Sequence, residues 1–275
     1  MSLSIDPNKG SDHSLRSLDD AAQRLGEASK QLSSGKRINS AADDPAGLSI
    51  ATRLTAELKS LDAVQRGMQD AVSLAQTAEG ALSGTSDDVA RIRELAVQAS
   101  NGTLSDADRS AIQAEVDQIV AGIDRTAQQT EFNGQSLLNG DIGSGSGVPV
   151  ATSSDGSGET VEVDDSSAAA LGVSGIDVSN VAGAQAAIDA ADSAATAVQE
   201  RRSALGAVEN RFAAAISQVQ VASENTAAAR SGIEDADIAK AAANQVAARI
   251  QRDFAIAMRA QLNQNQGSVF RLLEP

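Results

Sequence analysis

The sequence predicts a mainly α protein, a long antiparallel helical hairpin or coiled-coil rod with a small β-hairpin insertion. Its 275 residues include no Trp or Tyr and four Phe, and small apolar residues, mainly Ala, supply most of the 41% hydrophobic content. Such residues suit closely approaching helices better than a sandwich or a barrel. Apolar residues also recur at steps of three and four along most of the chain, which is the spacing of amphipathic helices.

The first helix is expected near the N-terminus and is expected to end at Gly35, because Gly readily adopts the left-handed backbone that follows a helix. Its apolar and small residues alternate steps of three and four, which is the pattern of a coiled-coil seam. These residues are Leu15, Leu18, Ala22, Leu25, Ser29 and Leu32.

A second, much longer helix is expected to start at Pro45. Asp44 is a good N-cap residue, and Pro45 fits the first helical position, where its missing N–H costs nothing. The same apolar rhythm continues to the turn signal Asn101-Gly102. A helix of this length runs about 80 Å, which is typical of rods and too long for a compact domain.

The third helix is expected to begin at Ser105, with Asp108 placed to complete a capping box. The turn signal Asn133-Gly134 follows it. Residues 141–167 then change character, because they are rich in Gly and Ser and carry only short alternating apolar runs. A small hairpin on a flexible connection is expected there.

Helical periodicity returns near Ser179 and lasts to about Arg230. After Gly232, Asp235 is expected to cap a last helix. The apolar stripe of this helix includes Ile238, Val246, Ile250, Phe254 and Leu262. Two helical arms, a tip and two returning arms bury their stripes most simply as an antiparallel hairpin.

The net charge of −15 is concentrated in the middle of the chain. Residues 1–40 hold six Lys/Arg against five Asp/Glu, and residues 236–275 hold five against three, so the rest carries a net −18. The two ends can therefore pack against copies of themselves with little repulsion. The acidic middle disfavours nucleic acid as a partner.

The residue types that carry most catalytic and metal chemistry are scarce. The chain has no Cys and a single His, His13, which excludes disulfides, thiolate zinc sites and H-E-x-x-H metal sites. No stretch reaches the length of a membrane span, and the first thirty residues lack the features of a cleavable signal peptide. We therefore expect no enzyme activity, no cofactor and no membrane partner.

Two charged pairs have a structural interpretation that competes with a chemical one. Asp43-Asp44 can be interpreted as catalytic carboxylates, but the Pro that follows favours helix capping. Lys36 and Arg37 can be interpreted as part of a phosphate site, but no glycine-rich cradle of the P-loop type accompanies them. A subunit contact or a solvated surface is favoured for this pair.

Five segments resemble the N- and C-terminal signatures of bacterial flagellins, in order and in spacing. Five collinear motifs are far more specific than any one of them, and together they cover nearly everything except about 141–180. The segments are LSSGKRINSAADDPAGLSIA (32–51), RIRELAVQASNGT (91–103), EFNGQSLLNG (131–140), LGAVENRF (205–212) and SGIEDADIAKAAANQVAARIQ (231–251).

The resemblance implies three parts with different roles. Residues 1–40 with 236–275 would form a coiled coil that lines the inner tube of a filament. Residues 41–140 with 180–235 would form the surrounding helical bundle, and residues 141–179 would be a short variable Gly/Ser-rich β-hairpin insertion. The self-assembly seam would consist of Leu15, Leu18, Leu25, Leu32, Val246, Ile250, Phe254 and Leu262.

By this resemblance, the chain is expected to be a structural subunit that polymerises into the bacterial flagellar filament used for swimming, secreted and extracellular. Its partners would be its own copies, the flagellar export apparatus, an export chaperone, and the filament cap and hook-junction proteins. The alternative is a low-copy hook-filament junction protein, which shares these motifs. A coiled-coil signalling module resembling a chemoreceptor rod also has long Ala-rich helices, but the flagellin motifs argue against it.

The resemblance also implies a patch for an innate receptor of animal hosts, the flagellin-sensing Toll-like receptor. Its residues would be Arg91, Leu95 and Glu115. Arg91 and Leu95 are four residues apart and share a helix face, and an antiparallel turn brings Glu115 alongside them. The competing interpretation is a solvated charged face with one exposed Leu.

Overall fold

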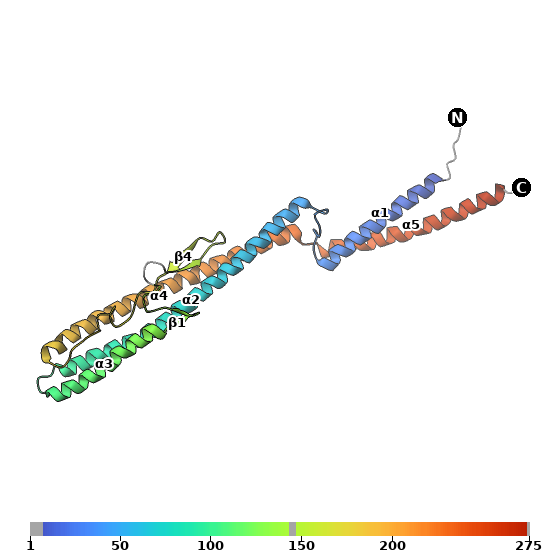
Figure 1. Cartoon of the computed structure of the whole chain (residues 1–275). Helices are drawn as coiled ribbons and strands as arrows, with labels where there is room; N and C mark the ends of the chain where they lie inside the picture. The colour runs from blue at the N-terminus through green and yellow to red at the C-terminus, as the bar shows by residue number, and fades with distance from the viewer. Residues whose placement is uncertain (1–7, 143–146, 274–275) are drawn as a thin grey trace. The chain divides into compact units, whose positions relative to one another are not determined.

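The computed structural model describes residues 8–142 and 147–273, and over these ranges the chain is mainly α, as predicted (Figure 1). The helices are α1 (Asn8–Ser34), α2 (Pro45–Ala99), α3 (Asp106–Gln129), α4 (Val181–Glu234) and α5 (Ile238–Leu273). Two antiparallel hairpins lie between α3 and α4 in the sequence. They pair β1 (Glu131–Phe132) with β2 (Gln135–Ser136) and β3 (Val148–Ala151) with β4 (Gly158–Val161). The second hairpin is the predicted insertion, whereas only a turn was predicted at the first.

The chain folds as two compact units. The terminal unit comprises residues 1–56 with 225–275, and the central unit comprises residues 57–224. The boundary between them falls inside α2 and α4, so each of these long helices contributes residues to both units.

Three helix ends predicted from capping residues are confirmed, those at Gly35, Asp44 and Ser105. Gly35 has a positive φ of 72° and donates its N–H to the Gln31 carbonyl at 2.9 Å, which closes the last turn of α1. At the start of α3, the Ser105 hydroxyl accepts from the Asp108 N–H, and the Asp108 carboxylate accepts from the Ser105 N–H. This reciprocal capping box satisfies two backbone donors that the helix itself leaves unpaired.

The start of α2 explains why Asp, Pro and Gly occur together there. The Asp44 carboxylate accepts the Gly47 N–H at 2.8 Å, which makes it the predicted N-cap. A β-carbon at Gly47 would lie 2.6 Å from Ile38 Cδ1 and closer still to the Asp44 carboxylate. A larger residue at position 47 would therefore have to push aside the Ile38 and Asp44 side chains, and moving Asp44 would disturb the cap.

The predicted cap of α5 was wrong by two residues. Helix α4 continues through Gly232 to Glu234, and Asp235 still donates its N–H to the Ser231 carbonyl. The cap of α5 is Asp237, whose carboxylate accepts the Lys240 N–H at 3.0 Å. An isolated Gly is tolerated inside a long helix, which is why it was a poor indicator of the break.

The core of the central unit lies between α2, α3 and α4. Its largest fully buried side chains include Met68, Leu82, Ile92, Val116 and Phe212. Ion pairs also join the helices at their exposed edges, and they link Arg93 to Asp192, Arg202 to Glu79, and Arg91 to Glu115.

The connection after the β3–β4 hairpin is packed, and the buried Val163 corrects the flexible connection expected over residues 141–167. Leu171, Val173 and Val178 are buried in the central core. The Val178 N–H donates to the Gln113 side chain at 2.6 Å, which fastens the segment to α3. The alternating apolar residues in this stretch decide its structure, because each one gains more from burial than the Gly residues lose in entropy.

In the terminal unit, α1 packs against α5 with the two helices antiparallel (Figure 1). Small residues are buried at steps of seven on both helices, Ser14, Ala21 and Ala28 on α1 and Ala241, Ala248 and Ala255 on α5. The sequence predicted Leu15 and Ala22 in the seam, but both are exposed. The buried small residues Ser14 and Ala21 lie one position earlier. Alanine positions let the helices approach closely, but they bury little apolar area.

Candidate assembly surface

The outward face of α5 carries a line of exposed large apolar side chains. Val246, Ile250 and Phe254 are four residues apart and are 57%, 64% and 67% exposed. A helix turns about 100° per residue, so Ile250 points away from the buried Ala248, two positions earlier. Helix α5 is therefore apolar on two faces, and α1 covers only the face with the alanines.

This line, which we call the outer stripe, is defined as Val246, Ile250 and Phe254. Single exposed apolar residues are ordinary on protein surfaces, but an aligned set on one helix marks a surface that another molecule covers. Ile256 and Met258 are also exposed on α5, one on each side of the helix. The exposed apolar surface thus extends around most of α5 away from α1.

The structure divides the predicted self-assembly seam between two locations. Leu18, Leu25 and Leu32 are half-buried, at the register positions between the buried small residues of α1. Leu262 is also half-buried, whereas Leu15 is exposed. The sequence predicted one seam that contains both these leucines and the outer stripe. In the structure, all three residues of the outer stripe are exposed, whereas most of the leucines are half-buried. Burial of either group between copies stays a prediction.

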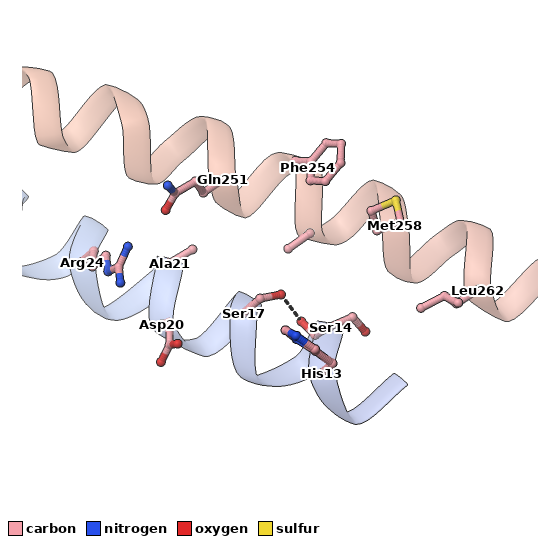
Figure 2. Close-up of a pocket in the computed structure, with 11 residues that line it drawn as sticks. His13, Ser14, Ser17, Asp20, Ala21, Arg24, Gln251, Phe254, Met258 and Leu262 are labelled. Carbon is pink, nitrogen blue, oxygen red and sulfur yellow. Dashed lines mark hydrogen bonds between the residues drawn. The ribbon is translucent and has the colours of Figure 1, made fainter. Parts of the chain in front are cut away.

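A groove runs along one edge of the α1–α5 pair and adjoins the outer stripe (Figure 2). It has a volume of about 580 Å³. Phe254, Met258 and Leu262 of α5 line one wall, and polar side chains of α1 line the other: His13, Ser17, Asp20 and Arg24. The groove offers an apolar wall and a charged rim to whatever covers it.

The segment that follows α1 is hydrogen-bonded to the segment that joins α4 to α5. We call this contact the clasp and define it as residues 35–38 with 233–236. The Arg37 N–H donates to the Glu234 carbonyl at 2.7 Å, and the Ala236 N–H donates to the Gly35 carbonyl at 2.9 Å. Lys36 Nζ lies 2.5 Å from a Glu234 carboxylate oxygen, and Glu234 is 12% exposed there. The clasp fixes where α1 and α5 start to run side by side.

The capping interpretation of Asp43-Asp44 agrees with the structure, whereas the contacts of Lys36 and Arg37 lie within the chain, so a contact of this pair with another subunit stays a prediction. Asp43 accepts the N–H groups of Asn39 and Ser40 at 2.9 and 2.8 Å, and these hydrogen bonds hold the pKa of its carboxyl below the usual value. Arg37 donates to the Ile233 carbonyl at 2.6 Å, which places its guanidinium at the C-terminal end of α4. All four side chains therefore serve the turn and the clasp.

Within residues 8–142 and 147–273, no group of three or more His, Cys, Asp or Glu side chains is arranged to hold a metal ion. None of the helices in that part of the chain is long and apolar enough to cross a membrane.

The structure joins two of the three residues predicted for a receptor patch. Arg91 of α2 and Glu115 of α3 form an ion pair of 2.7 Å at the surface, and Arg91 also contacts Glu94 at 2.6 Å. The hydrogen bonds that Arg91 donates to Glu115, and then to Glu94, raise the pKa of Arg91. Leu95, however, is 1% exposed and belongs to the central core, so its side chain offers almost no surface to a partner.

Comparison with known proteins assigns the chain to a family. Residues 6–142 match the family described as the bacterial flagellin N-terminal helical region, and residues 188–273 match the bacterial flagellin C-terminal helical region. The chain is 41% identical to a flagellin of Halalkalibacterium halodurans, with 90% of this chain and 91% of that protein aligned. It is 35% identical to the flagellar filament 30.7 kDa core protein of Treponema maltophilum, with 89% and 90% aligned.

A solved structure agrees with these relatives. The crystal structure of Bacillus cereus flagellin matches 60% of this chain and 94% of its own chain, at 30% identity and a TM-score of 0.50. The chain, with its long helices, its clasp and an α5 that is apolar on two faces, therefore belongs to the bacterial flagellin family.

Proposed function

We propose that this chain is a structural subunit that polymerises into a flagellar filament used for swimming. The observation that carries the proposal is the outer stripe, because Val246, Ile250 and Phe254 are exposed in the single chain and need a cover. A second copy supplies that cover at every position of a polymer. The names of the relatives, flagellin and flagellar filament core protein, support a filament subunit and do not favour a low-copy junction protein.

The three parts expected from the sequence are proposed to have distinct places in the filament. The terminal coiled coil, residues 1–40 with 236–275, would line the inner tube, and residues 41–140 with 180–235 would surround it. Residues 141–179 would lie outside. The charge distribution supports this order, because the nearly neutral ends can crowd together while the acidic middle faces water.

The proposed role is extracellular and non-catalytic. A subunit of an external filament has to leave the cell, so we propose that the flagellar export apparatus and an export chaperone handle the unassembled chain. The filament cap and the hook-junction proteins would contact it at the two ends of the polymer. These partners follow from membership of the family and from its structural role.

The test is nucleated polymerisation of the purified protein, followed by electron microscopy. The native chain should form long filaments, whereas Ile250→Asp should form none, because it would place a charge at a contact buried in every subunit. Leu25→Asp should also prevent assembly. Gln23→Asp adds the same charge on the exposed polar side of α1 and should still assemble. Normal filaments from Ile250→Asp would refute the assigned surface.

We also propose that Arg91 and Glu115 form the patch that a host Toll-like receptor binds on shed monomer. The exposed ion pair between them supports this role, since it presents fixed charges at a helix surface. In a receptor-reporter assay, Arg91→Ala and Glu115→Ala should lower activation by the monomer. Leu95→Ala should act through packing, so it should lower thermal stability as well. The proposal would be wrong if the native monomer does not activate the receptor, or if the Arg91→Ala/Glu115→Ala double variant activates it as strongly as the native monomer.

A further inference from the structure

The sulfur atoms of this chain differ sharply in their access to solvent. The sequence has no Cys and three Met residues. Met68 is 0% exposed in the central core, whereas Met258 is 44% exposed on α5. A thioether reacts with a dissolved oxidant only when the oxidant reaches the sulfur, so these two side chains should react at very different rates.

Met258 also lies where a change of polarity matters. Its side chain lines the groove between α1 and α5, next to Phe254 and Leu262 on the same wall (Figure 2). Phe254 is four residues earlier, so the two side chains share a helix face and join the outer stripe to the groove. Ser17, Asp20 and Arg24 line the opposite wall, where water hydrates them in the single chain.

We propose that Met258 is a peroxide-sensitive modification site and that its oxidation to the sulfoxide blocks assembly of the subunit. Hydrogen peroxide is the oxidant. The sulfur lone pair attacks one peroxide oxygen to form an S–O bond, the O–O bond breaks, and the displaced hydroxide takes the proton of the sulfur-bound OH, which leaves the sulfoxide and water. The sulfur is oxidised by two electrons, and the peroxide is reduced by the same two.

The physical consequence is a polar group on an apolar contact. A sulfoxide oxygen accepts hydrogen bonds, which water supplies in the free subunit and an apolar neighbour does not. Burying it unpaired should weaken association by about tenfold or more for each subunit. Met258 of an assembled subunit would be covered, so the modification would act on unassembled chains. This second half of the inference rests on the proposed function, whereas the selective oxidation of Met258 does not.

The test begins with peroxide treatment of the purified monomer and peptide mass spectrometry. Met258 should gain one oxygen atom well before Met68 does, and in preformed filaments Met258 should react slowly. The treated monomer should then elongate filament seeds about tenfold more slowly than the untreated monomer. Reduction by the two methionine sulfoxide reductases, one for each epimer, should restore elongation.

The matched control is Met258→Leu, which keeps an apolar side chain of similar size without sulfur. The elongation rate of this variant should be the same before and after peroxide, which excludes damage elsewhere in the chain as the cause. Equal oxidation of Met68 and Met258 would overturn the selectivity. Equal elongation by oxidised and untreated native monomer would overturn the block while leaving the proposed function intact. Failure of the untreated native monomer to elongate would instead count against the proposed function.

Discussion

At the scale of single residues, Asp88 is a carboxylate whose environment opposes its charge. Partial burial within α2 raises its pKa, and the neighbouring Asp87 raises it further. A raised pKa in the folded state means that ionised Asp88 destabilises the fold at neutral pH and that the penalty disappears as the pH falls through that pKa. Asp88→Asn should therefore raise the melting temperature at neutral pH and much less near pH 3. Thermal unfolding at both values checks this, and an equal gain at both would contradict it.

Arg109 is buried and holds the turn between α2 and α3. Its guanidinium donates to the carbonyls of Ala99, Leu104 and Asn101 at 3.0, 3.0 and 2.8 Å. Removing it leaves carbonyl groups at the end of α2 without partners, so Arg109→Ala should cost about 2 to 3 kcal/mol of unfolding free energy. The exposed Arg125 of the same helix provides the control, because Arg125→Ala should change the denaturant midpoint very little.

At the scale of elements, the clasp should set how well α1 and α5 present their contact surfaces. Glu234 is more buried than Lys36, so Glu234→Lys should destabilise the clasp more than Lys36→Glu. Each single variant should raise the critical concentration for assembly by up to about fivefold, the range for a partly exposed ion pair. The double variant Lys36→Glu/Glu234→Lys should recover most of the loss. Absence of any recovery would show that the pairing of charges is irrelevant.

Three helix ends were predictable because local chemistry determines them. Gly35, Asp44 and Ser105 each act on backbone groups within a few residues, so their roles are visible in the sequence. The register of the α1 seam was less predictable, because small residues occupy the contact positions and Ala22 is as apolar as Ala21. Only the position of α5 decides which alanine is buried.

The parts that depend on distant contacts were missed. The segment carrying Leu171 and Val173 has turns at Gly172 and Gly175, and its composition indicates a loose linker. Its burial depends on a contact with the neighbouring helix α3, which the periodicity of the sequence alone does not reveal. The two faces of α5 were partly visible, since the outer stripe was recognised, but its exposure in the single chain required the structure.

At the scale of the whole molecule, the net negative charge lies in one unit. Residues 57–224 hold 25 Asp/Glu against nine Lys/Arg, a net −16, whereas the terminal unit carries a net +1. Packing such subunits side by side brings like charges together, and salt screens their repulsion over about 10 Å at 0.1 M. Raising NaCl from about 0.05 to 0.5 M should therefore lower the critical concentration for assembly. Sedimentation of polymer at each salt concentration tests this, and weaker assembly in high salt would contradict it.

In the proposed filament, α5 buries its second apolar face only between copies. The alanine-rich contact of α1 with α5 covers little area, so the two helices should open readily in the monomer. Hydrogen exchange measured on monomer and on polymer tests this most directly. We predict fast exchange of amides in residues 8–34 and 238–273 of the monomer, and at least about hundredfold slower exchange of the same amides in the polymer. Equal exchange of these amides in both states would contradict it.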